Sequence, residues 1–346
     1  MNMREIAQRA GVSSATVSRV INGSAAVNEE TAQRVRAVLD AVNFIPNPSA
    51  TTLKYGRSKT FGVVVPDLSN PFFSEFLVNV EDELVQIDHE LLLTSVRDEE
   101  GLVRSIRRML MRQVDGAVLM GSEYETQAIE PLLLRRISLV TIDRRVTQAG
   151  CSDVAIHHEA GFLQAVAHLK ALGHRRIGYV GGISGMQTST LRAEAFRHAI
   201  REAGLAYHED LVREGDYRIG GGEAAARSLM QIADPPTALL HANDMTAFGT
   251  ALGIHRLGLR VPDDVSLVGF DDISLAQVAY PPLTTIRIPI RELARSCIKA
   301  LERTKQENCD TPGRQFSVPT QLVVRESTAP PRKTKRKAPS SRSSSI

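Results

Sequence analysis

The sequence predicts a small α-helical domain at the N-terminus, followed by a two-lobed α/β domain built on parallel sheets. Up to about residue 46, apolar side chains recur at helical spacing. From Thr60 onward, short runs rich in Val, Ile and Leu alternate with amphipathic stretches. This alternation is typical of parallel sheets that helices cover on both faces. A chain of 346 residues has room for two or three domains.

The composition indicates a globular protein of the cytoplasm. The three cysteines are scattered and odd in number, which argues against a disulfide framework and against a zinc site. The N-terminus has no apolar signal-peptide core, and no run approaches the roughly 18 apolar residues of a membrane helix. We therefore expect neither export nor a membrane span.

The charge is distributed unevenly along the chain. Residues 1–59 carry eight Lys and Arg against four Asp and Glu, a net charge of +4, and residues 329–346 carry +6. Because the whole chain has a formal charge of +3, the remainder carries −7. A basic head on an acidic body favours a head that meets phosphate and a body that stays away from it.

The first helix is expected over about Met3 to Ala10, with Ile6, Ala7 and Ala10 facing inward. Gly11 suits a turn with positive φ. Ser13 can then cap the next helix, because its side-chain oxygen accepts from free N–H groups at a helix start.

The second helix has one apolar face and one small polar face. Val17, Val20 and Ile21 share the buried side by their spacing. The opposite face carries Ser14, Ala15, Ser18, Arg19 and Asn22. Such a helix can enter the major groove of DNA, where Arg19 can bond guanine and Ala15 can touch a thymine methyl. A phosphate contact is the alternative for Arg19, and Ser14 and Ser18 are equally open to base and phosphate.

A third helix follows, capped by Asn28 and ending before Ile45-Pro46. Its apolar stripe is Val35, Val38, Leu39 and Val42.

The run from Met3 to about Arg57 closely resembles the LacI family of bacterial transcription regulators. The matching residues are Ile6-Ala7, Ala10-Gly11-Val12-Ser13, Thr16-Val17-Ser18-Arg19-Val20-Ile21-Asn22 and Phe44-Ile45-Pro46-Asn47. The resemblance continues through residue 328, and it implies a DNA-binding head on a periplasmic-binding-protein-like body that binds an effector. It implies DNA contacts from Ser13, Ser14, Ala15, Thr16, Ser18, Arg19, Asn22 and Asn47.

A short hinge is expected after Asn47, from Pro48 to Gly56. About eight residues cannot hold a helix alone in water, so we expect helix formation only on docking. In the family, the leucine that matches Leu53 enters the minor groove and kinks the central base step. Packing of Leu53 against its dimer mate alone is the alternative. Many relatives have Ala-Arg ahead of this leucine, but Ala50-Thr51 stands here, so a minor-groove arginine contact is not predicted.

The body contains seven candidate strands. They are residues 61–66, 90–96, 116–121, 138–143, 176–182, 237–242 and 265–271. Seven strands are too many for one tidy sheet, so two lobes are expected. Ligands of such sheets bind beyond the carboxyl ends of the strands.

The residues at these strand ends therefore nominate an effector cleft, and the resemblance supports the same choice. The candidates are Phe72, Phe73, Asp143, Arg144, Arg192, Tyr217, Asn243 and Asp271. Carboxylates, an amide and arginines can bond sugar hydroxyls, and an aromatic ring can cover an apolar sugar face. One of Phe72 and Phe73 is expected in the core, and Asp244 and Asp272 are expected to be helix caps.

Other site classes find little support. The adjacent His157 and His158 would point apart on a helix, so no metal site is expected, and no cofactor is expected either. No Ser-His-Asp or Cys-His set has supportive spacing. The body could serve a transport-type binding protein, but the head argues against that role. Asp143 and Asp271 could form the acid/base pair of a sugar-processing enzyme, yet nothing else indicates catalysis.

These patterns predict a cytoplasmic transcription regulator, most simply a repressor, whose operator affinity is controlled by a sugar or sugar derivative. We expect a helix-turn-helix domain at residues 1–46, a hinge at 47–57, an effector-binding and dimerisation domain at 58–328 and a disordered basic tail at 329–346. The chain lacks the leucine-rich C-terminal helix that makes tetramers in some relatives, which favours a homodimer.

Overall fold

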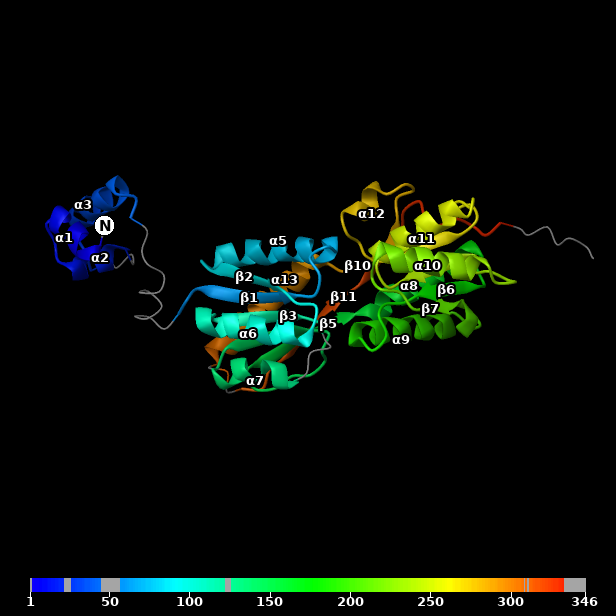
Figure 1. Ribbon diagram of the computed structural model, residues 1–346, viewed down its shortest axis with the longest axis horizontal. Coiled ribbons are helices and arrows are strands. Elements are labelled where there is room, and N and C mark those ends of the chain that lie inside the picture. The colour runs from blue at the N-terminus through cyan, green and yellow to red at the C-terminus, as the bar shows by residue number, and fades with distance from the viewer. Residues whose placement is uncertain are drawn as a thin grey trace, which may run out of the picture. The chain divides into compact units, whose positions relative to one another are not determined.

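The computed structural model describes residues 2–21, 26–44, 57–121, 126–307, 309 and 311–332 (Figure 1). The chain divides into two compact units, Met1–Ser58 and Lys59–Ile346. We call the first the N-terminal unit and the second the body. Of the predicted DNA contacts, Asn22, Asn47 and Leu53 lie outside the described residues.

The N-terminal unit contains three helices, α1 (Met3–Ala10), α2 (Ser14–Ile21) and α3 (Glu29–Ala41). Gly11 ends α1 with a φ of 67°, as the turn requires. The expected cap at Ser13 is confirmed, because its Oγ accepts from the backbone N of Thr16 at 3.1 Å. Asn28 likewise caps α3 by accepting from Thr31 N at 2.8 Å. A single small core holds the three helices together: Ile6, Ala7, Ala10, Val17, Val20, Ala32 and Val35.

The body has two lobes, each with its own six-stranded sheet. The sheet of lobe 1 is parallel throughout, in the order β11-β5-β4-β3-β1-β2. Its strands are β1 (Thr60–Val65), β2 (Glu90–Ser95), β3 (Gly116–Met120), β4 (Ser138–Ile142), β5 (Cys151–His157) and β11 (Gln315–Pro319). The helices α5 (Pro71–Gln86) and α13 (Ile290–Gln306) cover one face, and α6 (Glu99–Arg112) and α7 (Thr126–Leu134) cover the other (Figure 1).

Lobe 2 repeats this arrangement with the strand order β12-β10-β9-β8-β6-β7. Its strands are β6 (Ile177–Val180), β7 (Val212–Arg213), β8 (Ala238–His241), β9 (Ser266–Asp271), β10 (Thr284–Arg287) and β12 (Gln321–Val323), of which β12 is antiparallel to β10. Its helices are α8 (His158–Leu172), α9 (Gln187–Glu202), the short 3-10 turn η1 (Glu209–Leu211), α10 (Ile219–Met230), α11 (Asp244–Arg256) and α12 (Leu275–Val278).

The helices of lobe 2 pack as two pairs, α8 with α9 and α10 with α11. The second pair needs glycine at its crossing. A Cβ on Gly222 would lie 2.0 Å from the Thr246 carbonyl oxygen, and one on Gly249 would lie 2.0 Å from that of Ile219. These two glycines therefore allow the two helix backbones to touch.

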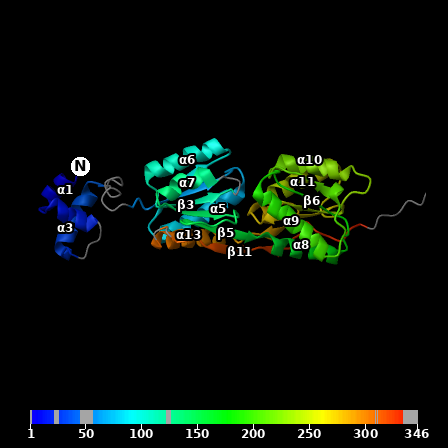
Figure 2. The same ribbon diagram turned by 90° about the horizontal axis from the view of Figure 1, so that it is seen from below.

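The chain passes between the lobes three times, from β5 to α8, from β10 to α13 and from β11 to β12. Figure 2 shows β5 and β11 close together at the junction. As a result, the carboxyl ends of the strands in both sheets face the space between the lobes. The prediction of two parallel α/β lobes is confirmed, as are all seven expected strands. Five strands were not predicted: β5, β7, β10, β11 and β12.

Candidate functional site

The polar face of α2 is presented outward by the small core behind it. Ser14, Ala15 and Arg19 are exposed, whereas Val17 and Val20 on the other face are buried. Because the core contacts of α2 come from its buried face, the residues of its outward face can be substituted without disturbing the core.

Two of the predicted DNA contacts also have a structural task. The hydroxyls of Ser13 and Thr16 lie 2.9 Å apart, and both take part in the cap of α2. Ser18 is half-buried. The residues most accessible to a base edge are therefore Ser14, Ala15 and Arg19.

In the body, Arg192 and Asp271 form a buried pair on lobe 2. Arg192 Nη2 lies 3.5 Å from Asp271 Oδ1, and Nη1 donates to the Ala242 carbonyl oxygen. The guanidinium carbon stands 4.0 Å from the centroid of the Phe270 ring. Arg192 Nε is buried without a hydrogen-bond partner among the described residues. This pair joins α9 to the end of β9.

The Asp271 carboxyl has a pKa close to neutral pH. It lies at the end of β9 with a φ of 110°, which turns the chain out of the sheet. Burial raises the pKa of Asp271 to about 7, and the nearby Arg192 opposes that rise. Such a carboxyl can accept from a ligand hydroxyl once it is ionised.

A second buried pair is formed by Asp143, after β4 of lobe 1, and His158, the first residue of α8. Asp143 follows β4 with a φ of 58° and is 2% exposed. Its Oδ1 accepts from Ile156 N at 2.7 Å, and its Oδ2 lies 2.8 Å from His158 Nε2. Burial lowers the pKa of His158, so the imidazole is neutral at pH 7. His158 was not among the predicted cleft residues, because its role depends on the contact between the β5–α8 junction and β4.

Asn243 and Tyr217 are linked to each other on lobe 2. Asn243 Oδ1 caps α11 by accepting from Thr246 N at 2.9 Å, and its Nδ2 donates to the Tyr217 carbonyl oxygen at 3.0 Å. The Tyr217 hydroxyl lies 2.8 Å from Ser189 Oγ. Asn243 thus positions Tyr217 as well as the start of α11.

The expectation that Asp244 and Asp272 are helix caps is wrong. Asn243 caps α11, whereas Asp244 accepts from Thr285 Oγ1 at 2.5 Å and from Ile273 N at 2.9 Å. Asp272 forms ion pairs with Arg287 and Arg325, both at 2.6 Å. These carboxylates hold the β9–α12 segment, which sequence spacing alone could not reveal.

Phe72, Phe73 and Arg144 complete the predicted cleft set. Phe72 is buried in the main core and Phe73 is half-buried, with their ring centroids 5.4 Å apart. This agrees with the expectation that one of the two is a core residue. Arg144 is buried, and its carbonyl oxygen accepts from Gln187 Nε2 at 3.1 Å.

Contacts between the lobes involve residues that the sequence did not nominate. Asp67 of lobe 1 and Arg218 of lobe 2 form an ion pair at 2.8 Å. Ser274 N donates to Glu75 Oε1 on α5, also at 2.8 Å. Because Asp67 and Arg218 are 151 residues apart in the chain, no local pattern marks them as partners.

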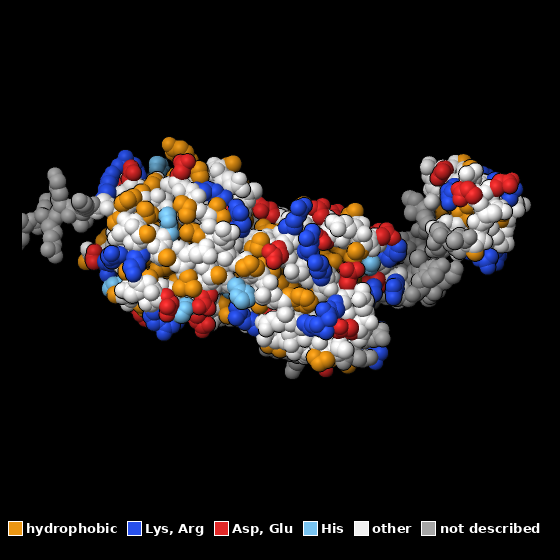
Figure 3. Space-filling view, turned by 180° about the vertical axis from the view of Figure 1, so that it is seen from behind, with side chains coloured by type: hydrophobic (Ala, Val, Ile, Leu, Met, Phe, Trp, Pro, Cys, Tyr) orange, Lys and Arg blue, Asp and Glu red, His pale blue; other side chains and the backbone are white. Residues whose placement is uncertain are grey.

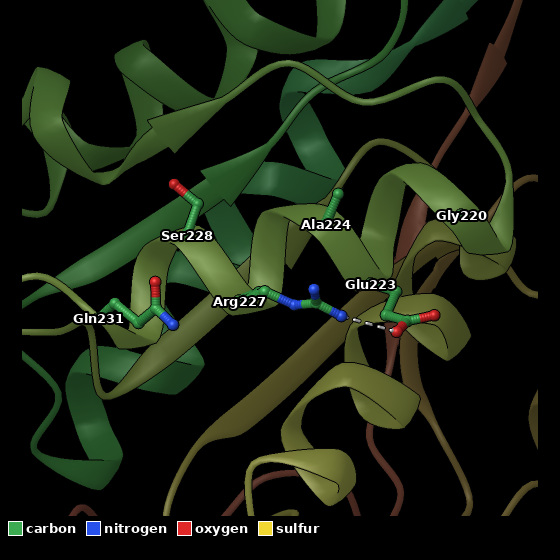
Figure 4. Close-up of a pocket in the computed structure, with 6 residues that line it drawn as sticks. All are labelled: Gly220, Glu223, Ala224, Arg227, Ser228 and Gln231. Atoms are coloured by element: carbon green, nitrogen blue, oxygen red, sulfur yellow. Dashed lines mark hydrogen bonds and ion pairs between the residues drawn. The ribbon is translucent and has the colours of Figure 1, made fainter.

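A separate hollow lies along α10, as Figure 4 shows. It encloses about 460 Å³, and its lining residues come from this helix and from Gln231 directly after it, including the pair Arg227–Glu223 at 3.4 Å. It contains none of the predicted cleft residues.

Among the described residues, no cluster of His, Cys, Asp and Glu is arranged to hold a metal ion. Within the same part of the chain, no helix is long and apolar enough to cross a membrane.

Comparison with known proteins gives consistent matches over nearly the whole chain. Residues 2–47 match the model of bacterial regulatory proteins of the lacI family, and residues 166–328 match that of the periplasmic binding protein-like domain. The transcriptional repressor PurR of Photobacterium profundum is 33% identical over 329 residues, which cover 94% of this chain and 98% of that protein.

Solved structures agree. The lac repressor dimer bound to operator and the anti-inducer ONPF aligns with a TM-score of 0.83 and 27% identity, covering 95% of this chain and 99% of that one. A LacI family regulator from Enterococcus faecium with bound ribose aligns with a TM-score of 0.71 and 29% identity, covering 79% of this chain and 100% of that one.

Proposed function

Because the chain belongs to the LacI family of bacterial transcription regulators, we propose that it is a cytoplasmic, sugar-responsive repressor that binds its operator as a homodimer. The observation that carries this proposal is the exposed face of α2, with Ser14, Ala15 and Arg19 turned away from the core of a separate unit. A relative of known structure, the lac repressor dimer, is bound to operator DNA. A dimer places two such helices in successive major grooves of a roughly palindromic site.

The hinge completes the DNA contact in this proposal. Leu53 from each subunit enters the minor groove at the centre of the operator and bends it. The cost of ordering the hinge is then met only when DNA is bound.

An apolar surface on the body supports the homodimer. Val78 and Val85 on α5 and Val278 on α12 are more than half exposed, and Tyr280 just beyond α12 is fully exposed. Figure 1 places α5 and α12 along the same margin of the body, and the bond from Ser274 N to Glu75 joins them. Exposed apolar groups gathered in this way are typical of protein–protein contacts.

The cleft chemistry supports a neutral sugar or sugar derivative as effector. The Arg192 guanidinium is already engaged by the Asp271 carboxyl and by the Ala242 carbonyl oxygen, so the floor of lobe 2 offers a partnered arginine rather than one free to bind an anion. Phe73 and Tyr217 supply half-buried aromatic surface, which suits an apolar sugar face. The ribose bound to the Enterococcus faecium regulator is consistent with this class of ligand.

Effector binding would change operator affinity through the arrangement of the lobes. The contacts Asp67–Arg218 and Ser274–Glu75 depend on the separation of the lobes. Glu75 lies on α5, whose outer face belongs to the proposed dimer surface. A change in lobe separation therefore shifts that surface, and with it the two hinges. A coupling of about 1–3 kcal/mol is typical of such systems.

The test is operator binding by the full chain, with and without sugars. Fluorescence anisotropy on a palindromic fragment selected from random DNA should show that an inducing sugar weakens binding about 5- to 150-fold. Asp271→Asn should bind the operator as well as the original chain but lose the sugar response. An equal sugar response in this variant would contradict the assignment of the cleft, and a sugar that tightens binding would identify a corepressor.

A further inference from the structure

The chain leaves the body at the amino ends of the lobe 2 strands. Ala329 N donates to Ser266 Oγ at 3.0 Å, and the Ala329 carbonyl oxygen accepts from Ser266 Oγ at 3.0 Å and from His174 Nε2 at 2.9 Å. Ser266 is the first residue of β9, and His174 lies just ahead of β6. Because β6, β8 and β9 are parallel, their amino ends share one edge of the sheet. Ala329 is therefore fixed at that edge.

The chain enters the body at the opposite end. Strand β1 begins at Thr60, at the amino edge of the lobe 1 sheet. Since the carboxyl ends of both sheets face the space between the lobes, their amino ends point away from each other. Figure 1 shows the start of β1 at one end of the body and the last described residues at the other. We call the end at Thr60 the entry pole and the end at Ala329 the exit pole.

The exit pole carries two cations that no carboxylate pairs. Arg175 directly follows the histidine that holds Ala329, and its Nη1 donates to backbone carbonyl oxygens at 3.3 and 3.5 Å. Lys170 Nζ donates to the carbonyl oxygen that follows α9, at 2.5 Å. Neither side chain has an ion-pair partner among the described residues, and both are exposed. The nearby Asp234 and Asp264 are each paired with an arginine already. Figure 3 shows Lys and Arg side chains, with Asp and Glu among them, at this end of the body.

The sequence beyond the exit pole adds a run of positive charge. Residues 333–346, which lie outside the described residues, read KTKRKAPSSRSSSI. We call them the cationic segment. They contain five Lys and Arg and no Asp or Glu: Lys333, Lys335, Arg336, Lys337 and Arg342. A run of cations uninterrupted by acids suits a polyanion such as DNA, from which each neutralised phosphate releases condensed counterions.

The reach of this segment decides which DNA it can contact. Its last cation, Arg342, is ten residues beyond Arg332 and therefore at most about 36 Å from it. The helices α5 and α8 run alongside the strands, one in each lobe, and have 16 and 15 residues. At 1.5 Å per residue, they place the two poles about 46 Å or more apart. The cations of the segment therefore stop short of the entry pole, where the chain connects to the N-terminal unit.

We propose that the cationic segment, together with Lys170 and Arg175, binds the phosphate backbone of a second DNA duplex without sequence preference. The first duplex is the operator on the side of the entry pole, and this part rests on the proposed function. In the proposed homodimer both entry poles face one operator, so both exit poles, each with five segment cations, face away from it. The protein thereby joins two duplexes. Once the operator holds it, neighbouring DNA is present at a high effective concentration.

The acidic body is the competing partner for the cationic segment. Residues 60–328 carry a net charge of −7. At the exit pole, however, the carboxylates Asp234 and Asp264 are already engaged by Arg176 and Arg332. A DNA duplex offers a dense row of phosphates instead, so DNA is the better partner for five closely spaced cations.

The salt dependence of binding to a random duplex tests the segment without any operator. The variant replaces the five cations together: Lys333→Gln, Lys335→Gln, Arg336→Gln, Lys337→Gln and Arg342→Gln. Its plot of log affinity against log salt should be shallower than that of the full chain by about 2–4.5 per chain, since each neutralised phosphate contributes about 0.9. A control with Ser343→Ala, Ser344→Ala and Ser345→Ala keeps every charge and should keep the slope. An unchanged slope in the glutamine variant overturns the proposal, and it would place the segment on the acidic body.

Capture of a second duplex tests the bridge. The full chain is bound to an immobilised operator, and a fluorescent random duplex is then added. The full chain should retain this duplex, whereas the glutamine variant should bind the operator equally well and retain at least tenfold less. Lys170→Gln combined with Arg175→Gln should cause a smaller loss.

Two results of the capture experiment would contradict the bridge. If the full chain holds the operator but retains no second duplex, while the glutamine variant binds the operator more weakly, the segment contacts the operator itself. If phosphatidylglycerol vesicles bind the full chain more tightly than the random duplex does, its partner is a membrane. A failure of the operator proposal looks different, because the chain would then show no preference for the operator while the difference in salt slope remained.

Discussion

On α2 of the N-terminal unit, Ser14, Ala15 and Arg19 lie exposed, with their side chains outside the core of the unit. The predicted cleft residues of the body are placed in the opposite way. Asp143, Arg192, Asn243 and Asp271 are all at most 6% exposed, and each is hydrogen-bonded to another part of the body.

In the N-terminal unit, the residues of the exposed face are therefore different from those that stabilise the fold. In the body, the predicted cleft residues also stabilise the fold. Sequence readout by α2 can change at little cost to folding, because the small core lies on the opposite face of the helix. In the body, the residues proposed to bond the effector also hold strands and helices together, so a substitution there should change both properties. The predictions below test how far this contrast extends.

The largest effect is expected for Arg192→Ala. Removing the guanidinium leaves the buried Asp271 carboxyl and the Ala242 carbonyl oxygen without their partner. Loss of one member of a buried pair costs about 3–5 kcal/mol in the free energy of unfolding. Urea unfolding of the body measures this loss. Arg201→Ala on the same helix, but exposed, should cost no more than about 0.5 kcal/mol. Equal losses would show that position on α9 matters more than burial.

Arg19→Ala tests the other side of the contrast. The side chain is exposed, so the stability of the N-terminal unit should remain unchanged, while discrimination between operator and random DNA falls by about 1–3 kcal/mol. Competition binding with both DNAs at one salt concentration measures this. A uniform loss on both DNAs would make Arg19 a phosphate contact.

The same contrast explains which features the sequence could reveal. Strand β3 is an uninterrupted apolar run, β8 is apolar up to its last residue, and the face of α2 follows from helical spacing. Strand β5 escaped notice because Ser152 and Asp153 interrupt its apolar residues. Local sequence patterns therefore predict helices and strands well, and they also predict surfaces that a single helix presents.

Sites made by distant segments were harder to predict. His158 is a cleft neighbour only because β5 delivers it to Asp143, and Arg218 meets Asp67 only across the lobes. Sequence position suggested that Asn243 contacts ligand and that Asp244 caps a helix. The structure gives the cap to Asn243 instead, because its side chain precedes the first turn of α11.

A change of pH is expected to have a smaller effect, on the affinity for the sugar. Burial raises the pKa of Asp271 to about 7, with Arg192 opposing the rise and Glu75 adding to it. If the ionised carboxylate accepts from the effector, sugar affinity should rise by up to about tenfold between pH 6 and pH 8. Calorimetric titration across this range checks the slope, and Asp271→Asn should flatten it.

Stability should respond to the same group in the opposite direction. A carboxyl whose pKa is higher in the folded than in the unfolded protein favours folding while it is protonated. Its contribution is therefore present at low pH and is lost as the pH rises through about 7.

Sugar affinity that falls with rising pH would contradict the first of these two pH predictions. It would show that the protonated Asp271 acid, as a donor, binds the effector.

The smallest effect concerns Ser13, a residue of the N-terminal unit that behaves like those of the body. Its Oγ accepts from Thr16 N at 3.1 Å, so Ser13→Ala should remove the cap of α2 and cost about 1 kcal/mol in stability. Ser14→Ala, one residue further and exposed, should stay within about 0.5 kcal/mol. Amide hydrogen exchange in α1, α2 and α3 measures both. If the two variants lose protection equally, Ser13 and Ser14 do not differ in their contribution to stability. The whole start of α2 would then serve both DNA recognition and folding.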